Sequence, residues 1–349
     1  MRAAVPGEGT VLARLLRELS DAHDAWGGYP SSRDAHVYTE LAHRLDDDAR
    51  IRGGSTALGG HLRVVADLGG LASGQVEGGV IRHGVHPTTP FTCDVRSLIV
   101  AKRARGMGVG RALLQALAGA ARLLSGGAPY LLAAEVLEPN PALSFYRRLG
   151  YKPVAHSVRI GSAHGATITA GASAGPAARI AIAADARAVA GLGAMLAARR
   201  RAAGDFRFDP PSPTIDERVV RDLAASFGSQ PPGYRPADPA ILVSVRGDGA
   251  VLGAAFFATQ NLDPPLIPLR RALVGGFALV PGCPVAPVVA SIVALACQIA
   301  VVEGAPYVEI ADLPAPGTEL HVAALATGGV RWSRTLINRP TCDYRLSCE

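Results

Sequence analysis

Residues 98–111 contain the residue types that could bind a phosphate group. An apolar run of the length of one buried strand ends at Val100, and a basic turn with glycines at positions 106, 108 and 110 follows it. From Arg111 onward, apolar residues recur at helical spacing. A strand that enters a helix through glycines leaves N–H groups pointing outward, because the first four donors of a helix have no acceptor inside it. Those donors and the positive end of the helix dipole attract anions, so we expect this turn to bind phosphate.

Three kinds of phosphate site could use such a turn. A Walker-type loop requires Gly-Lys-Ser/Thr, and Arg111 follows the last glycine here. A dinucleotide site requires G-x-G-x-x-G and an acidic residue about 20 positions later. The glycines here have a different spacing, and Glu135 comes too late.

The third kind of site rests on a resemblance to a known family. The sequence Arg105-Gly106-Met107-Gly108-Val109-Gly110 resembles R/Q-x-x-G-x-G/A, the pyrophosphate loop of the GNAT acetyltransferases. The approach to it, Val100-x-Lys102-x-x-Arg105, is similar to the end of the family's fourth strand. A second motif, Asn-Pro-Ala-Leu-Ser-Phe-Tyr-Arg-Arg-Leu-Gly-Tyr at residues 140–151, resembles a later helix of the family. One spacing differs, because Asn140 stands two residues before the alanine and many members have three.

The resemblance implies a ligand and a set of contacts. Acetyl-CoA would lie in a V between the fourth and fifth strands, as a cosubstrate or a tightly bound ligand, and no metal is implied. Its pantetheine arm would pair with the backbone of residues 98–100, and its diphosphate would bind the N–H groups of the turn. The expected contact residues are Leu98, Ile99, Val100, Arg105, Gly106, Met107, Gly108, Val109, Gly110, Arg111, Asn140, Phe145 and Tyr146.

The resemblance also implies direct attack of an amine on the thioester. A strand N–H near Leu98 or Ile99 would polarise the thioester carbonyl. Tyr146 would protonate the leaving thiolate, and packing between helix and sheet is the alternative role of its ring. Asn140 would either hold the pantetheine amide or cap the helix that begins near Pro141.

The general base stays open between two carboxylates. Glu135 lies on the strand beside the expected cleft, and Asp94 lies at the start of the preceding strand. Either could take a proton through water if burial raised its pKa, and each could equally be a surface carboxylate. We take Glu135 and Tyr146 as the expected catalytic residues.

Composition excludes several classes of partner. The net charge is +6 over 349 residues, yet Lys102 and Lys152 are the only lysines and the basic runs lack interleaved aromatic residues. We therefore expect no nucleic-acid partner, and we expect Arg199–Arg201 to form a solvated helix face. Five scattered cysteines, no signal-peptide core and no apolar run of bilayer length favour a cytoplasmic protein, monomer or homodimer, with no membrane partner.

A metal site is not expected either. His83 and His86 precede Cys93 and Asp94, but this spacing does not match a known ligand set, and ordinary loop histidines are the simpler interpretation.

The expected elements follow the GNAT order in the first half. Apolar spacing predicts helices at 11–23, with Thr10 as its N-cap, at 35–45, from 111 and near 142. It predicts strands at 62–68, 75–82, 91–100, 130–136 and 153–160, of which the last would close the sheet.

The second half repeats this order. Strands are expected at 180–182, 241–245, 251–258, 272–280, 307–310 and 330–337, and helices at 184–199, 215–227, 288–301 and 319–326. We therefore expect an α/β fold of two tandem GNAT domains, a layout that resembles tandem proteins such as mycothiol synthase. Each domain would be a mixed, mostly antiparallel twisted sheet flanked by helices and splayed between its fourth and fifth strands. The expected boundaries are 1–165, a linker at 166–178, and 179–349.

The second half lacks the phosphate motif. Its corresponding loop, residues 281–287, carries prolines without N–H donors and has no arginine, so we expect weak or absent CoA binding there. This half would either cover the first as a packing partner or shape the acceptor site, where Glu309, Asp312 and His321 could lie.

The expected function is acetyl-CoA-dependent N-acetylation of a small-molecule amine. The chain is rich in glycine and alanine, which is typical of proteins from GC-rich genomes. Together with the tandem layout, this composition suggests secondary metabolism of the clavulanic acid type as one setting. The alternative is an acyl-CoA-binding protein in which acetyl-CoA in the first half is structural or sensory and any transfer occurs in the second half.

Overall fold

The computed structural model describes residues 1–58, 60–82, 90–128, 130–168, 175–208, 216–228, 239–262, 265–266 and 270–338. The first half of the chain has the predicted order of helices and strands. Its elements are α1 (Gly9–Ala25), α2 (Ala35–Arg52), β1 (Ala57–Leu58), β2 (His61–Leu68), β3 (Leu71–Arg82), β4 (Phe91–Val100), α3 (Val109–Leu124), β5 (Tyr130–Leu137), α4 (Ala142–Arg148) and β6 (Lys152–Gly161). A short 3-10 turn, η1 (Lys102–Ala104), joins β4 to the glycine turn.

The second half follows the same succession. Its elements are α5 (Ser162–Ile168), β7 (Ala177–Ile180), η3 (Ala183–Asp185), α6 (Ala186–Ala202), η4 (Phe206–Phe208), α7 (Glu217–Gly228), β8 (Ala240–Val245), β9 (Val251–Asn261), β10 (Arg270–Leu279), α8 (Val285–Val302), β11 (Tyr307–Leu313), α9 (Glu319–Ala326) and β12 (Val330–Asn338). The mixed α/β fold predicted from the sequence is therefore confirmed.

Helix α1 begins at Gly9, so the prediction that Thr10 caps it is wrong. The Asp46 carboxylate of α2 accepts hydrogen bonds from the N–H groups of Gly7 at 2.9 Å and Gly9 at 2.7 Å. A side chain of a neighbouring helix thus satisfies donors that an N-cap residue would otherwise satisfy.

Residues 162–168 form helix α5, which overlaps the start of the linker expected at 166–178. The small residues of α5 allow a close approach to α8, because a Cβ on Gly165 would come within 2.3 Å of Cys297 Sγ. The low apolar content therefore reflects tight packing between two helices.

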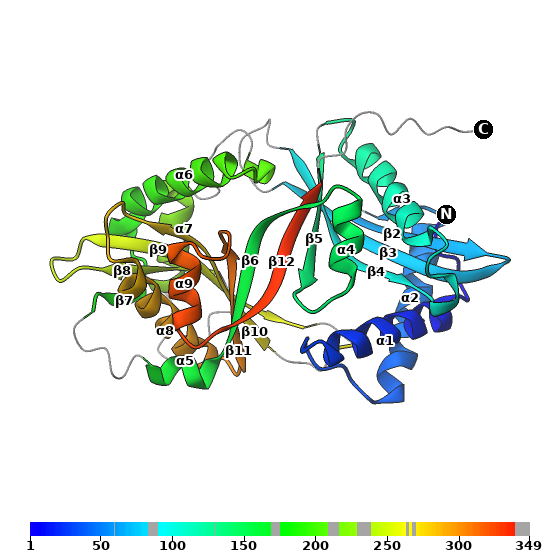
Figure 1. Ribbon diagram of the computed structural model, residues 1–349, viewed down its shortest axis with the longest axis horizontal. Coiled ribbons are helices and arrows are strands. Elements are labelled where there is room, and N and C mark those ends of the chain that lie inside the picture. Colours follow the sequence, from blue (N-terminus) through cyan, green and yellow to red (C-terminus); the bar gives the residue numbers. More distant parts are fainter. Residues whose placement is uncertain are drawn as a thin grey trace.

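The two halves exchange one strand each within a single sheet. The twelve strands described lie in the order β1-β2-β3-β4-β5-β12-β6-β11-β10-β9-β8-β7. Strand β12 of the second half is antiparallel to both β5 and β6, and β6 is antiparallel to β11 (Figure 1). The expected closing strand, β6, is therefore separated from β5 by a strand of the other half. This exchange pairs strand edges that each half alone would leave open.

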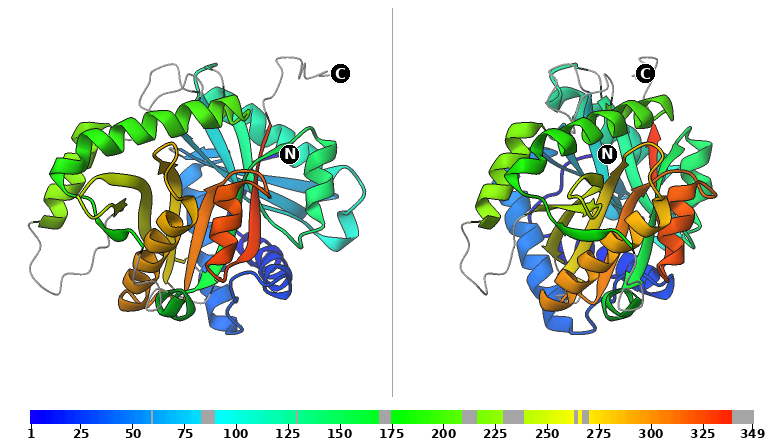
Figure 2. Two further views of the ribbon diagram at one scale, coloured as in Figure 1. Left: turned by 60° about the vertical axis from the view of Figure 1, so that its left-hand side comes forward. Right: turned by 90° about the vertical axis from the view of Figure 1, so that its left-hand side faces the viewer.

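Alternate residues of the strands enter separate cores on the two faces of the sheet. On β2, Leu62 and Val64 pack with α3 and α4, whereas Val65 packs with α1 and α2. On β8, Leu242 packs with α8 and α9, whereas Ile241 packs with α6 and α7. The sheet twists strongly from one half to the other (Figure 2).

Helix α8 is longer than its sequence pattern indicated. It has 18 residues and a mean hydropathy of 2.4, so it is long and apolar enough to cross a membrane by length and composition alone. In this fold it lies in the second-half core, where Val288, Ile292 and Val293 are buried together with Leu242 and Val274.

Candidate active site

Strands β4 and β5 separate partway along their length, as predicted. Their parallel pairing ends at Val95 opposite Ala134, although β4 continues to Val100. Arg96 forms a bulge at this point, because Val95 and Ser97 pair with consecutive residues of β3. One edge of β4 is therefore free of β5 from residue 96 onward.

The free edge of β4 presents defined backbone groups to the V. The Ala101 N–H is donated to the Ser73 carbonyl of β3 at 2.9 Å. Since alternate residues of a strand direct their N–H groups to the same side, Ile99 also faces β3, and Leu98 and Val100 face the V. Of the two donors considered from sequence, Leu98 is the one on the open side.

The glycine turn beyond β4 adopts left-handed backbone conformations. Gly106 has φ +81° and Gly108 has φ +78°, which glycine adopts without steric cost. The Arg105 Nε–H is donated to the Val100 carbonyl at 3.0 Å, so this side chain fixes the turn to the end of the strand.

The turn leads directly into the N-terminus of α3. The first helical hydrogen bond runs from the Ala112 N–H to the Gly108 carbonyl at 3.1 Å, and no side chain caps the helix. The N–H groups of Val109, Gly110 and Arg111 therefore have no acceptor within the helix. This arrangement suits an anion such as a diphosphate.

Helix α4 packs against this N-terminus. A Cβ on Gly110 would lie 3.3 Å from the Phe145 ring, so the absence of a side chain at Gly110 allows the two helices to pack closely. Asn140 Oδ1 accepts a hydrogen bond from the Ala142 N–H at 2.9 Å, which is the capping role considered from sequence.

Tyr146 lies in the core beneath α4. Its side chain is 6% exposed, and its ring makes edge contacts with Phe145 and Tyr151. Burial raises the pKa of the Tyr146 phenol, so the group is a neutral donor at ordinary pH. Tyr146 does not line the cavity that contains the acidic residues described next.

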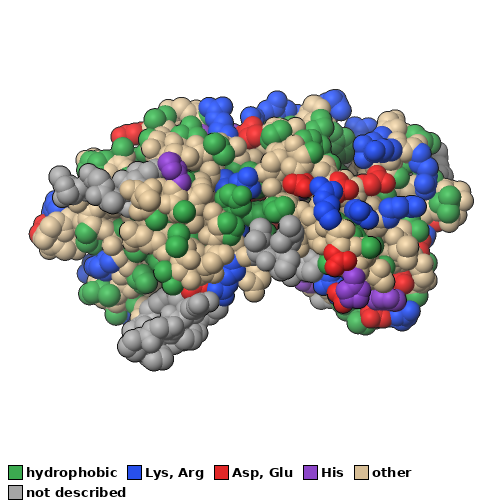
Figure 3. Space-filling view, turned by 90° about the horizontal axis from the view of Figure 1, so that it is seen from below, with side chains coloured by type: hydrophobic (Ala, Val, Ile, Leu, Met, Phe, Trp, Pro, Cys, Tyr) green, Lys and Arg blue, Asp and Glu red, His purple; other side chains and the backbone are tan. Residues whose placement is uncertain are grey.

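A cavity of about 850 Å³ lies over the central strands, on the face that carries α1 and η4. Residues of β4, β5, β6, β10, β11 and β12 form its floor, so both halves contribute. Its charged or aromatic lining residues are His23, Tyr29, Asp94, Arg96, Glu135, Arg207, Arg271, Glu309, Asp312 and Trp332. Seen from below, the surface is hollowed between two lobes, and charged side chains gather mainly on the first half (Figure 3).

Asp94 and Glu135 enter this cavity from β4 and β5. Burial raises the pKa of Asp94 to about 6; Arg207 and Arg96 oppose this shift, and Glu135 reinforces it. Glu135 is exposed and accepts a hydrogen bond from Ser333 Oγ at 2.5 Å. The structure thus brings the two base candidates together in one cavity, and burial raises the pKa of Asp94.

The second half supplies the opposite wall. Glu309 is 2% exposed, and it accepts hydrogen bonds from the Tyr29 hydroxyl and, at 3.4 Å, from Arg271 Nη1. Arg271 also donates to Gln260 Oε1 from Nε at 3.2 Å and from Nη2 at 2.9 Å. Burial raises the pKa of Glu309, and the positive charge of Arg271 opposes the shift.

An aromatic cluster closes the cavity beside Glu309. The Arg159 guanidinium of β6 lies 3.6 Å from the Trp332 ring centroid and 4.5 Å from that of Tyr307. Its Nη2 donates to the Gly27 carbonyl at 2.8 Å, which holds the segment after α1 against the second half. No sequence pattern indicates this cluster, Tyr29 or Arg271, because the residues come from segments far apart in the chain.

Asp312 occupies the position in β11 that Glu135 occupies in β5, one residue beyond the last parallel pair. Its φ of +60° is the only positive value of a non-glycine residue among those described. Its carboxylate lies 3.3 Å from Arg200 and 3.5 Å from Arg207, and Arg207 is also paired with buried Asp205 at 2.8 Å. These contacts hold the strained backbone in place.

The V of the second half is closed by arginine side chains. Arg199 Nη2 donates to the Phe277 carbonyl of β10 at 3.3 Å, and Arg200 Nη2 donates to the Asp312 carbonyl at 2.8 Å. The prediction that Arg199–Arg201 form a solvated helix face is therefore wrong for Arg199 and Arg200, whose side chains cross from α6 to the strands, and Arg201 lies over the Phe206 ring of η4.

The loop of the second half is also poor in donors. Helix α8 begins after Pro284, and Pro287 in its first turn has no N–H. Among the described residues, the start of α8 therefore has fewer unpaired N–H groups than the start of α3. The sequence predicted this difference.

The remaining candidates lie apart from the cavity. His321 packs against His156 with ring centroids 5.7 Å apart, on the face that carries α9. Cys93 is fully buried, and burial raises the pKa of its thiol to about 12. No cluster of three or more His, Cys, Asp or Glu suited to a metal occurs in the described part of the chain, and His83 and His86 lie outside it.

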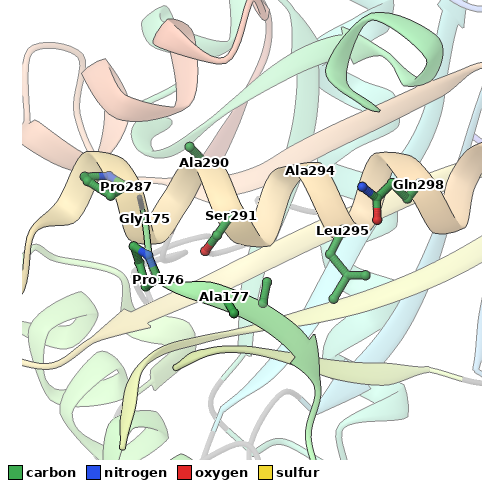
Figure 4. A pocket seen from close by; sticks show the side chains of 10 residues that line it. Gly175, Pro176, Ala177, Pro287, Ala290, Ser291, Ala294, Leu295 and Gln298 are labelled. Atoms are coloured by element: carbon green, nitrogen blue, oxygen red, sulfur yellow. The ribbon is translucent and has the colours of Figure 1, made fainter. Parts of the chain in front are cut away.

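A smaller cavity of about 340 Å³ lies between α8 and the start of β7 (Figure 4). Its wall consists of small, apolar and amide side chains, and Ser291 is hydrogen-bonded to Ser244 Oγ at 2.9 Å. It offers no titratable group for catalysis.

Comparison with known proteins agrees with this geometry. Residues 60–153 match the acetyltransferase (GNAT) domain family. The fold of the whole chain is similar to that of a GCN5-related N-acetyltransferase from Sphaerobacter thermophilus, with a TM-score of 0.54, 18% identity and coverage of 98% and 96% of the two chains. A tandem GNAT protein from the clavulanic acid biosynthesis pathway has a TM-score of 0.48 and 17% identity, with 98% of each chain covered. None of the curated proteins compared with the chain matches it.

Residues 60–153 therefore match a GNAT acetyltransferase domain, and the fold of the whole chain is similar to that of a GNAT protein. The V, the glycine turn and α4 all lie within or beside the matched residues.

Proposed function

We propose that the protein is an acetyl-CoA-dependent N-acetyltransferase that acts on a small-molecule amine. The observation that carries this proposal is the junction of two features at one point of the sheet. A free strand edge with uncapped helix amides lies beside a cavity that contains Asp94, whose pKa is raised to about 6.

The residues of the first half fit acetyl-CoA. The free edge of β4 offers the backbone groups of Leu98 and the N–H of Val100 to the pantetheine arm, and the amides of residues 109–111 offer donors to the diphosphate. Phe145 would border the diphosphate site through its contact with Gly110. When bound, acetyl-CoA supplies the thioester that the amine attacks.

The cavity residues would manage the protons of the reaction. Asp94 takes a proton from the ammonium group of the acceptor, directly or through water, and frees its lone pair. The amine nitrogen then bonds to the acetyl carbon as the carbon–sulfur bond breaks, and the Leu98 N–H stabilises the developing negative charge on oxygen. Tyr146 gives its phenolic proton to the departing sulfur and regains a proton, through water, from the nitrogen of the new amide, and the proton on Asp94 returns to solvent.

The chain divides by function as well as by sequence. We place one acetyl-CoA site in residues 1–165, a connection at 166–178, and the acceptor-binding lobe in residues 179–349. The closed second V and the donor-poor loop support a single CoA site. A cytoplasmic location fits the scattered cysteines.

Thiol release tests the activity. Purified protein with acetyl-CoA is mixed with a broad panel of amines, which includes amino acids, amino sugars and intermediates of antibiotic biosynthesis, and free thiol is measured. We expect release above background for at least one acceptor, with a matching mass gain of one acetyl group on it. Tight acetyl-CoA binding with no release across the panel would favour the structural or sensory role instead.

A further inference from the structure

The cavity has an acidic pole in the first half. Asp94 and Glu135 both line it, and neither forms an ion pair with any residue that the structure describes. A protonated amine would compensate both carboxylates, and two acidic groups beside one cation keep it oriented.

The arginines that line the cavity differ in their positions and in the hydrogen bonds that their guanidinium groups already make. Arg207 is 8% exposed and donates from both Nε and Nη2 to the Asp205 carboxylate, at 2.9 and 2.8 Å. Arg96 lies at the exposed bulge and contacts His61 Nδ1 at 2.9 Å. The Arg207 guanidinium is therefore held by Asp205, and Arg96 lies on β4 near Asp94, at the acidic end of the cavity and not on the second-half wall.

Arg271 retains binding capacity on the second-half wall. Its contacts with Gln260 and Glu309 use the Nε–H and one N–H on each Nη nitrogen. One N–H on each Nη remains without a partner among the described residues. Gln260 is neutral, and the 3.4 Å contact to Glu309 is longer than the roughly 2.7–2.9 Å of a strong charge-assisted bond. Much of the positive charge of Arg271 is therefore available to a ligand.

Glu309 and Tyr29 hold this arginine in position. The Tyr29 hydroxyl donates to Glu309, and Glu309 then orients one edge of the Arg271 guanidinium. Tyr29 belongs to the segment after α1 of the first half, so the two halves jointly fix the site. With Gln260 bound to Nε and Nη2 and Glu309 bound to Nη1, the guanidinium keeps one N–H on each Nη for recognition of a carboxylate or phosphate.

We propose that the acceptor is a zwitterionic amine that spans the two halves. Its ammonium group binds between Asp94 and Glu135, and an anionic group at its other end binds Arg271. This inference rests on the proposed function, because it assigns the acceptor class of that reaction. It gives the second half a specific task, the recognition of the acceptor's anionic end.

Matched ligands test this assignment by isothermal titration calorimetry. The protein is saturated with coenzyme A, so that no transfer occurs, and titrated with β-alanine, γ-aminobutyrate and ε-aminocaproate. Each acid is compared with the straight-chain amine of equal carbon number, which has no carboxylate. O-phosphoethanolamine is the arm that distinguishes phosphate from carboxylate as the preferred anion.

At one chain length the acid should bind about tenfold or more tightly than its matched amine, the effect of one charge-assisted pair. Arg271→Met should reduce this preference to within about twofold. Arg271→Lys should retain part of it, because the charge remains and the planar fork is lost. Arg246→Met is the matched control, since this exposed arginine pairs with Asp248 on a distant hairpin.

Three results would overturn the assignment: equal binding of acids and amines, a preference that survives Arg271→Met in a protein of unchanged melting temperature, or no binding of any zwitterion. Thiol release separates this failure from that of the proposed function. Acetylation of plain amines without preference for acids would leave the acetyltransferase and remove only the zwitterion. Selective binding of the acids without any acetylation would leave the site and remove the activity.

Discussion

Asp94 is the residue whose environment has the clearest chemical consequence. It shares the cavity with Glu135, but burial raises the pKa of Asp94 to about 6, close to the pH at which a general base works well. The sequence offered both carboxylates as bases, and their burial distinguishes them.

Asp94→Asn should lower kcat by about 100-fold or more while leaving acetyl-CoA affinity unchanged. In the wild type, kcat/KM should rise with pH through about 6, as Asp94 loses its proton, and this rise should vanish in the variant. Steady-state thiol release across pH checks both points. Glu40→Gln, at an exposed site on α2, is the control, and an unchanged pH profile in Asp94→Asn would exclude Asp94 as the base.

The ionised Asp94 side chain should lower the free energy of unfolding of the protein. The folded-state pKa of Asp94 lies above the ordinary value, so its contribution to stability is present at low pH and is lost as pH rises through about 6. Asp94→Asn should therefore be more stable than the wild type above this range, by on the order of 2 kcal/mol, and equal to it well below. Urea denaturation well below and well above pH 6 measures this difference. A variant less stable than the wild type at the higher pH would contradict the prediction.

Tyr146→Phe separates the acid role of the phenol from its packing role. The ring would keep its contacts with Phe145 and Tyr151, so the free energy of unfolding should change by less than about 1 kcal/mol. If the phenol protonates the thiolate, kcat should fall about 100-fold with acetyl-CoA affinity retained. Unchanged kcat would show that Tyr146 only packs.

At the scale of elements, the glycine turn and the start of α3 form the proposed anion site. Gly108→Val should strain the backbone at a φ of +78° and weaken acetyl-CoA binding by about tenfold or more. Gly119→Ala is the matched control on the same helix, where a Cβ meets nothing within 4 Å. It should stabilise the protein by about 0.5–1 kcal/mol and leave binding unchanged. Equal affinity of both variants, by calorimetry, would remove the turn from the site.

The strand exchange makes the two halves mutually dependent. Residues 1–168 produced alone would lack β12, leaving β5 and β6 with open edges, and should not form a stable monomer. Produced together with residues 175–349, they should assemble into a complex of one copy each. Light scattering after size exclusion measures this, and a folded, monomeric first half on its own would contradict it.

The sequence predicts local elements here far better than their pairing. The strand at 330–337 and the closing strand at 153–160 were both correctly expected, because apolar alternation is a local property. Nothing in either segment indicates that β12 lies between β5 and β6. Likewise, Leu98, Gly108 and Asp94 are found through local motifs, whereas Tyr29, Arg271 and Glu309 meet only through long-range folding.

At the scale of the whole molecule, the two similar halves have different surroundings. In the first half the edge of β4 beyond Val95 is open and the helix amides are free. In the second half, Arg199 and Arg200 donate hydrogen bonds to backbone carbonyls of β10 and β11 beside the equivalent V. Prolines at the start of α8 replace residues that would supply N–H donors. The first half thus fits the proposed acetyl-CoA site, and the cavity lined by both halves fits the proposed acceptor site.

The number of acetyl-CoA molecules per chain tests this central claim most directly. Native mass spectrometry of the protein with excess acetyl-CoA should show one bound molecule per chain, and Gly108→Val should remove it. Two molecules per chain, or one that persists in Gly108→Val and disappears when the second-half loop is altered, would contradict the division of roles between the halves.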